Sequence, residues 1–146
     1  MKTKQNLSIF FLLLTFSFLF ISCSEKEISL PNPELKKIYG KWDWSRTSGG
    51  FTGGTSTPKT EGFTVYFELE KNGTCKWYQN DQLVNEVGYI LKVDNSNFYI
   101  DFSSPIQTNL FLTDNNYHIT FYGNDTIHFS LDNCYDCFYY DFVRQK

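Results

Sequence analysis

Two cysteines near the C-terminus, in the run Cys134-Tyr135-Asp136-Cys137, have the spacing that most directly suggests chemistry. A Cys-x-x-Cys pair can be a redox-active dithiol at the start of a helix, or half of a zinc site when a second ligand pair is present. Neither context occurs, because no helical pattern follows and no second Cys or His pair lies nearby. We expect a disulfide between Cys134 and Cys137 that closes the last hairpin turn. A bridge from Cys75 to either partner remains the alternative.

The remaining residues with chemical potential do not form a recognisable constellation. His118 and His128 fall on two strands of one predicted hairpin and face outward, without a carboxylate at ligand spacing. We expect exposed surface histidines and no metal site. No Ser or Cys nucleophile has a placed His, and Glu68, Asp101 and Asp141 fall on outward strand positions, where solvated charge is expected. The sequence predicts neither an enzyme nor a bound cofactor.

The N-terminus has the pattern of an export signal. Lys2 and Lys4 precede an apolar run over residues 7–21, which is shorter than the roughly 20 residues of a membrane-spanning helix. The run Leu19-Phe20-Ile21-Ser22-Cys23 resembles a bacterial lipobox, in which the cysteine receives acyl chains such as palmitate and becomes the mature N-terminus. The resemblance implies a signal peptide over residues 1–22 and a lipidated Cys23 with a tether through residue 37, which would hold the protein on a membrane. An ordinary signal peptide cut nearby is the alternative.

The segment after Cys23 and the net charge indicate the compartment and exclude one class of partner. Ser24-Glu25-Lys26-Glu27 loosely resembles acidic signals that send some Gram-negative lipoproteins to the outer face of the outer membrane; a plain solvated tether is the alternative. Loss of residues 1–22 leaves 11 basic and 16 acidic residues, a net charge of −5. An acidic chain without a basic cluster does not have the charge that nucleic-acid binding requires.

From Tyr39 onward the chain alternates apolar and polar residues, as half-buried antiparallel strands do. In residues 63–70 this places Phe63, Val65, Phe67 and Leu69 on one face. A three-residue loop at 71–73 would then set Leu69 opposite Cys75 and Phe67 opposite Trp77. Further strands are predicted over residues 84–93, 98–102, 108–112, 117–122, 126–131 and 138–144, with one possible helical turn at 34–38.

The spacing of these strands predicts an all-β domain over residues 38–146. A sandwich and a closed antiparallel up-and-down barrel of about eight to nine strands are both compatible with the pattern. Short consecutive hairpins favour the barrel, because closure removes exposed sheet edges. The one long connection, over residues 47–62, is rich in Gly, Thr and Ser, so we expect it to be mobile or to fold over one mouth of the barrel.

The first and last predicted strands resemble those of lipocalins and the wider calycin barrels. Such barrels begin with Gly-x-Trp and end with an arginine that packs on the tryptophan, and this chain has Gly40-Lys41-Trp42 and Arg144. The resemblance implies that Gly40, Trp42 and Arg144 form a plug at the closed end, where guanidinium on indole is a favourable contact. The order of features also resembles small lipocalin-like bacterial lipoproteins.

Two functions fit this architecture. The first is a membrane-anchored, lipocalin-like lipoprotein of the Gram-negative cell envelope whose barrel binds a small apolar ligand. The alternative is a solid barrel that binds an envelope protein or glycan, or inhibits a secreted enzyme, through its loops and outer aromatic residues. The interior of about eight strands either fills with side chains or holds one small molecule. The candidate ligand-lining residues are Trp44, Phe67, Trp77, Tyr89, Phe102, Phe121, Phe129 and Tyr140.

Overall fold

A computed structural model describes residues 32–110, 112, 114–132 and 134–146 of the chain. The predicted signal peptide, Cys23 and nearly all of the predicted tether lie outside the described residues. Neither described helix is of a length or apolar character that could span a bilayer, since η1 has six residues and α2 has four.

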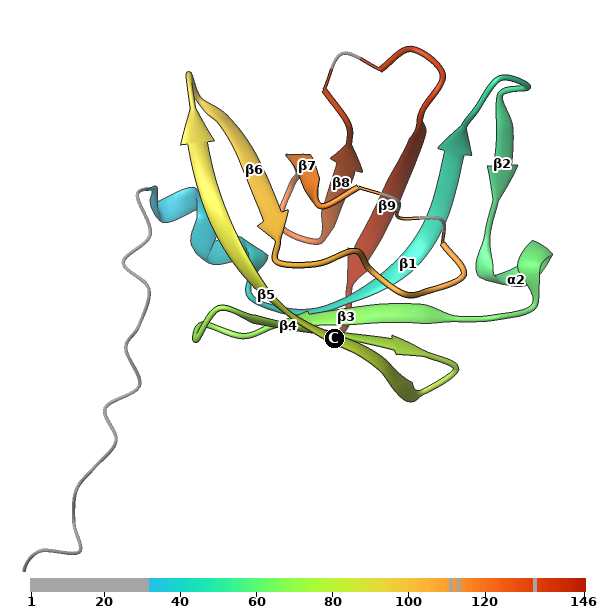
Figure 1. The fold of residues 1–146 in the computed structure, drawn as a ribbon, viewed down its shortest axis with the longest axis horizontal. Helices are drawn as coiled ribbons and strands as arrows, with labels where there is room; N and C mark the ends of the chain where they lie inside the picture. Colours follow the sequence, from blue (N-terminus) through green and yellow to red (C-terminus); the bar gives the residue numbers. More distant parts are fainter. Residues whose placement is uncertain (1–31, 111, 113, 133) are drawn as a thin grey trace, which may run out of the picture.

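Strands are the predominant secondary structure of the described chain (Figure 1). A short 3-10 helix, η1 (Pro33–Ile38), and a single-turn helix, α2 (Pro58–Glu61), are its two helical elements. The strands are β1 (Gly40–Gly49), β2 (Gly54–Ser56), β3 (Val65–Leu69), β4 (Thr74–Gln79), β5 (Gln82–Asp94), β6 (Asn97–Phe102), β7 (Asn116–Tyr122), β8 (Thr126–Ser130) and β9 (Phe138–Arg144).

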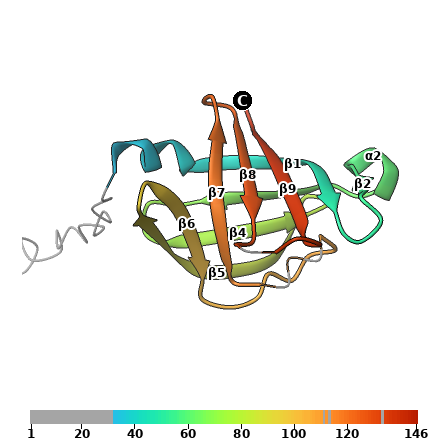
Figure 2. The same ribbon diagram turned by 90° about the horizontal axis from the view of Figure 1, so that it is seen from above.

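The strands form a closed antiparallel barrel, which confirms the predicted fold class. The order β1-β3-β4-β5-β6-β7-β8-β9 follows the chain, and β9 returns to pair with β1. β2 is an extra strand that pairs with the last residues of β1, and Figure 2 shows it with α2 at one end of the barrel. Closure satisfies the main-chain groups that an open sheet would leave exposed at its edges.

The hairpin predicted from residues 63–75 has the expected register. Leu69 pairs with Cys75, and Phe67 pairs with Trp77. The turn between β3 and β4 requires a positive φ at Gly73, which is +89°. Because glycine has no Cβ, it adopts this angle without the steric cost that other residues would meet. Local sequence therefore determines the pairing of these two strands.

The predicted strand over residues 108–112 is wrong. Residues 108–110 form a bend and a turn within the connection between β6 and β7, and residue 112 is not in a strand either. Ile106, Leu110 and Leu112 in this connection are nevertheless buried. These apolar residues lie in a connection that covers one end of the closed barrel and does not pair with a strand.

The long connection after β1 is partly ordered and folds at one end of the barrel. β1 itself continues to Gly49, and β2 pairs back onto it from Thr55 to Ser48 and from Ser56 to Thr47. α2 then begins with Pro58 behind a capping box in which the side chains of Thr57 and Thr60 accept each other's main-chain N–H groups. Of the two outcomes expected for this connection, folding at the barrel end is the one observed.

The up-and-down order gives the barrel two distinct ends. At the closed end β1 begins, β9 ends, and η1 packs with Leu35 and Ile38 buried. The opposite end, here called the mouth, is formed by the β1–β2 turn, the turn at 80–81 and the described residues of the β6–β7 and β8–β9 connections. Figure 1 shows η1 on one side of the molecule and β2 with α2 on the other.

Candidate functional site

The closed end is sealed by the three residues that the sequence indicated. Trp42 is fully buried, and its indole Nε1 donates to the main-chain oxygen of Ile38 at 2.7 Å. The guanidinium carbon of Arg144 lies 4.1 Å from the centre of the Trp42 ring. A Cβ at Gly40, whose φ is +110°, would lie 3.2 Å from Arg144 Nη1. The predicted contact between the first and last strands is therefore present, and glycine makes room for it.

Arg144 also binds three main-chain oxygens from two segments of the closed end. It donates to Tyr39 at 2.9 Å, to Asn124 at 3.2 Å and to Lys37. These carbonyls belong to the chain around η1 and to the β7–β8 turn. One side chain thus ties the helix, the turn and the Trp42 ring together, so this end is built to be closed.

Most of the predicted ligand-lining residues pack against one another instead of around a cavity. Phe67 lies 4.8 Å from Trp77 and 5.7 Å from Phe129, measured between ring centres, and Trp77 lies 5.9 Å from Phe102. All four side chains are buried. Rings at these separations and tilts are in direct contact, so this part of the interior is filled by the protein itself.

The other predicted lining residues have different surroundings. Tyr140 is buried beside Tyr117, with 6.2 Å between ring centres. Tyr89 is buried, and its hydroxyl donates to the main-chain oxygen of Glu70 at 2.6 Å. Phe121 is only half-buried and meets Phe98 edge to face. None of them borders the pocket described next.

A small apolar pocket lies at the mouth and has a volume of about 160 Å³. Its walls come from β1, β2, the end of α2, the segment before β3, the β6–β7 connection and the start of β9, with Glu61 as its charged member and Asn109 as its amide member. The other residues lining this mouth pocket are Trp44, Thr47, Ser56, Phe63, Leu110 and Phe138. Of the ligand-lining residues predicted from sequence, Trp44 alone borders it.

Trp44 is held in one orientation within the mouth pocket. Its ring stacks on Phe63 at 5.5 Å between centres, with 17° between the planes, and its Nε1 donates to Thr47 Oγ1 at 3.0 Å. The indole N–H is therefore satisfied by the protein, and the ring presents its apolar surface. A preformed apolar wall of this kind favours an apolar group over a polar one.

Two apolar residues that line the mouth pocket, Phe138 and Leu110, were not predicted from the sequence. Phe138 shares the inward parity of Tyr140 and Phe142 on β9, so strand alternation could have identified it. Leu110 lies in the segment wrongly predicted as a strand, and no local pattern indicates that this segment reaches Trp44.

The buried side chains of Tyr117 and Tyr140 remain protonated at neutral pH. Burial raises the pKa of Tyr140 to about 12, and it also raises the pKa of Tyr117. Tyr117 Oη accepts a hydrogen bond from the Asp114 main-chain N–H at 3.2 Å. These side chains are therefore neutral packing groups rather than ionised bases.

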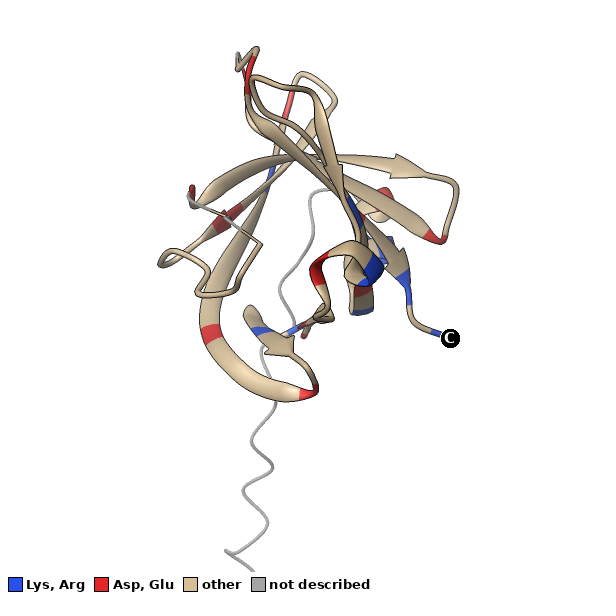
Figure 3. Cartoon of the chain, turned by 90° about the vertical axis from the view of Figure 1, so that its right-hand side faces the viewer, with Lys and Arg blue, Asp and Glu red and all other residues tan. Residues whose placement is uncertain are grey.

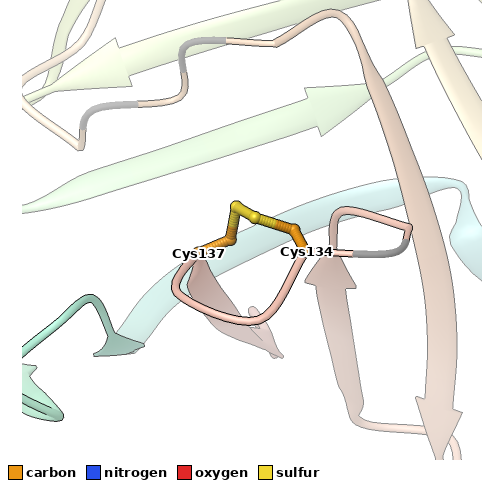
Figure 4. The surroundings of a disulfide bond; sticks show 2 residues. All are labelled: Cys134 and Cys137. Atoms are coloured by element: carbon orange, nitrogen blue, oxygen red, sulfur yellow. A yellow bond between two sulfur atoms is a disulfide. The ribbon is translucent and has the colours of Figure 1, made fainter.

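Two aromatic side chains project from the loops beside the mouth pocket. Phe51 in the β1–β2 turn is 93% exposed, and Tyr135 in the β8–β9 connection is 98% exposed. Tyr135 lies between Cys134 and Cys137, which form the predicted disulfide (Figure 4). The two loops are adjacent, because Gly50 N donates to Cys137 O at 3.2 Å. Cys75 is free and buried, so the alternative bridge is absent.

The expectation of isolated, exposed side chains at His128 and Asp141 is wrong. Both lie on the outer face, as predicted, but His128 Nδ1 is 2.6 Å from Asp141 Oδ1, and Asp141 is only 9% exposed. Arg46 donates to Asp141 Oδ2 from Nε at 2.8 Å and from Nη2 at 2.6 Å. His118 is half-buried beside Tyr99. The Arg46 contact could not be foreseen because β1 and β9 become neighbours only when the barrel closes, and the His128 contact depends on the register of the consecutive strands β8 and β9.

Burial of Asp141 on its own would raise its pKa, but the hydrogen bonds from His128 and Arg46 outweigh this effect, and the pKa is lowered. Asp141 is therefore ionised at neutral pH and is shared between two donors. No group of three or more His, Cys, Asp or Glu side chains with the proximity to hold a metal ion occurs among the described residues.

Comparisons with models of known protein families, with curated proteins and with solved structures found no match to this chain.

Proposed function

We propose that this protein is a lipid-anchored, lipocalin-like lipoprotein of the Gram-negative cell envelope that binds a small apolar group at the mouth of its barrel. The mouth pocket carries the proposal, because it is apolar, preformed and bordered by the fixed ring of Trp44. The binding site proposed here is narrower than the whole barrel interior, since the rings below Trp44 already fill that space.

The size of the mouth pocket limits the ligand. A cavity of about 150 Å³ accepts benzene in a protein interior, and the mouth pocket has about 160 Å³. Drug-sized ligands occupy pockets of roughly 300 to 1,000 Å³. The proposed ligand is therefore a single ring or a short branched alkyl group, either as a free molecule or as the end of a larger one.

The arrangement of the two ends supports a mouth that faces away from the membrane. The chain enters the described domain through η1 at the closed end. The helix, turns and C-terminus at this end carry the basic residues Lys36, Lys37, Lys71, Arg144 and Lys146 and the acidic residues Glu34, Glu70, Asp94 and Asp125. The mouth connections carry the acidic residues Glu61, Asp81, Asp114, Asp132 and Asp136 with one lysine, Lys59. Figure 3, which views the side where β2 and α2 lie, marks the charged residues. An anionic membrane surface attracts the more basic end, so a tether at Cys23 and the charge distribution favour the same orientation.

Binding to the mouth pocket can be tested with the soluble domain from Ser24 onward and fluorobenzene as the probe, observed by ¹⁹F NMR. We expect the fluorine signal to broaden and shift saturably with the wild-type protein. Ser56→Trp places a large ring at the pocket wall and should abolish the effect. Thr55→Trp is the matched control, because Thr55 is exposed on the adjacent position of β2. An unchanged probe signal with wild type, or equal signals with both variants, would reject the mouth pocket as a ligand site.

The alternative function, an interaction module, is favoured by one separate observation. Phe51 and Tyr135 are almost completely exposed on adjacent loops, and one of these loops is closed by a disulfide. Large aromatic side chains at the centre of an interface contribute a large share of binding energy. A photo-reactive phenylalanine at position 135 should cross-link a partner in cells, whereas the same group at Val93, a partly exposed position on β5, should not. Equal cross-linking from both positions would argue against a partner at the mouth.

The membrane anchor requires its own test, because Cys23 lies outside the described residues. Cells that express the wild-type chain are grown with a fatty-acid analogue, and the protein is compared with Cys23→Ala. We expect labelling of the wild type alone. Equal labelling of both would contradict lipidation at Cys23, and the absence of labelling in both would favour an ordinary signal peptide.

A further inference from the structure

A row of three side chains crosses the outer face of the barrel. Arg46 on β1 and His128 on β8 are the direct cross-strand neighbours of Asp141 on β9. Asp141 is the one charged or polar residue classed as buried in the described part of the chain. Its two carboxylate oxygens are divided between the partners, with Oδ1 next to His128 and Oδ2 next to Arg46.

A β-bulge reshapes the sheet at this row. The pairing of β1 with β9 shifts register between Trp44 and Arg46, so that Ser45 is the extra residue. Ser45 Oγ donates to the main-chain oxygen of Asp141 at 3.0 Å, and the next residue, Arg46, donates to the Asp141 side chain. Bulges re-aim side chains and occur often beside functional sites. Here the bulge brings two consecutive polar side chains to a single residue of β9.

These residues line an open groove of about 560 Å³. Its remaining walls are Thr57 before α2, Tyr122 at the end of β7 and Thr126 at the start of β8. Tyr122 is 59% exposed and lies edge-on to the His128 ring, with 6.1 Å between ring centres. On its other side His128 stacks on Tyr139 at 5.5 Å, which fixes the imidazole plane.

The groove presents fixed donors and acceptors whose charges largely cancel. Arg46 donates from Nε and from Nη2 to Asp141 Oδ2, which leaves Nη1 as a further donor. His128 uses Nδ1 toward Asp141, so its Nε2 is the other polar atom of the ring. Ser45, Thr57 and Thr126 add hydroxyl groups, each of which can donate and accept. Because the Arg46 and Asp141 charges compensate each other, a net-charged ligand gains little here.

We propose that this groove is a binding site for a neutral saccharide. A sugar carries many hydroxyl groups that both donate and accept, which matches the side chains of the groove. One face of a pyranose ring carries C–H groups with partial positive charge, and these pack on the electron-rich face of an aromatic ring. Tyr122 supplies such a ring at the edge of the groove. The groove volume is within the range of small-ligand sites.

The proposal does not depend on the mouth pocket, since the two sites share no lining residue. It can be tested with the soluble domain and the methyl glycosides of glucose, galactose and N-acetylglucosamine, together with their β-linked disaccharides. Saturation-transfer NMR detects binding, and calorimetry gives the dissociation constant. We expect at least one of these sugars to bind. In the NMR spectrum of the protein, the bound sugar should change the chemical shifts of groove residues only, including those of the His128 imidazole.

Variants locate the binding and separate it from a structural role. Tyr122→Ala should weaken binding about tenfold, and Arg46→Lys should weaken it several-fold because lysine keeps the charge but loses the planar fork. Tyr66→Ala is the matched control, because Tyr66 is an outer-face tyrosine that stacks on Tyr78 outside the groove. The thermal unfolding of each variant is recorded alongside, so that loss of binding is not confused with loss of the fold.

Three results would overturn the proposal. The first is no binding of any sugar in the panel at millimolar concentration. The second is binding that Tyr122→Ala and Arg46→Lys leave unchanged, because the sugar would then occupy another surface. The third is preferential binding of inorganic sulfate at the groove, which would show that the Arg46 charge is not compensated by Asp141.

Discussion

Arg144 provides the sharpest test of how the barrel is closed. Its guanidinium donates to the main-chain oxygens of Tyr39, Asn124 and Lys37 and lies on the Trp42 ring. Arg144→Met keeps most of the aliphatic stem of the side chain but removes all three hydrogen bonds and the positive charge. The variant therefore isolates the polar clamp from the packing of the stem.

The expected loss of stability follows from these contacts. A hydrogen bond from a charged group contributes about 1.5 to 3 kcal/mol when it is well shielded. Arg144 is half-exposed, so water can replace part of each bond, and about 1 kcal/mol for each carbonyl is the appropriate scale. The contact with the Trp42 ring adds about 0.5 to 1 kcal/mol. We expect Arg144→Met to lower the free energy of unfolding by about 3.5 to 4 kcal/mol, which corresponds to a fall in Tm of roughly 10 to 15 °C.

The assay is urea unfolding of the soluble domain, followed by tryptophan fluorescence and by circular dichroism. Lys41→Met is the matched control, since Lys41 lies at the same end, is exposed and has only a 3.9 Å ion pair with Glu68. It should change stability by less than about 1 kcal/mol. Arg144→Lys should fall between wild type and Arg144→Met. A loss below about 1 kcal/mol for Arg144→Met at an unchanged m-value would refute the clamp.

Trp42→Ala should cost about 3 to 5 kcal/mol, because it empties a fully buried ring site; a neutral effect on urea unfolding would show that the ring does not support the barrel. Burial raises the pKa of the Cys75 thiol well above its ordinary value, so a thiol reagent at pH 8 should react with it only after unfolding, and rapid labelling of the native protein would contradict this. Reduction of the Cys134–Cys137 disulfide should destabilise the domain by about 2 kcal/mol, given the short loop it closes, as measured by thermal unfolding with and without reductant; an unchanged Tm would count against the bond as a stabilising link. The lowered pKa of Asp141 means that its contribution to stability is present above the carboxyl pKa of the unfolded chain, about 4, and is lost as the pH falls through the lower pKa of the folded state. Asp141→Asn should therefore flatten the acid limb of the stability curve, and an identical limb in both proteins would contradict this assignment.

Some predictions succeeded because they depended on neighbours in sequence. The alternation in residues 63–70 and the glycine in the following loop set the β3–β4 register, since a slip of one residue would turn every apolar side chain outward. The prediction for residues 108–112 failed although its apolar residues are buried. Alternation reports which side chains are covered, and it does not report whether a strand edge is available for pairing.

The predicted ligand-lining residues show a different limit. Trp44, Phe67 and Trp77 all have inward parity, but only Trp44 borders the mouth pocket, while Phe67 and Trp77 pack together. Parity gives the direction of a side chain, whereas a cavity depends on how the volumes of residues from many strands add up at one level of the barrel. Sequence alternation alone therefore could not separate a filled interior from a pocket.

The sequence by itself determined the all-β class and the pairing of the β3–β4 hairpin, because period-two alternation and turn glycines act through strand geometry, while the resemblance to calycin barrels indicated that Trp42 and Arg144 meet at the closed end. The tertiary structure alone decided that the interior is largely filled, that the free space lies at the mouth beside Trp44, and that Arg46, Asp141 and His128 form one row. The physical reason is closure: β9 meets both β1 and β8 only in the complete barrel, so contacts between those strands depend on the register of the whole sheet.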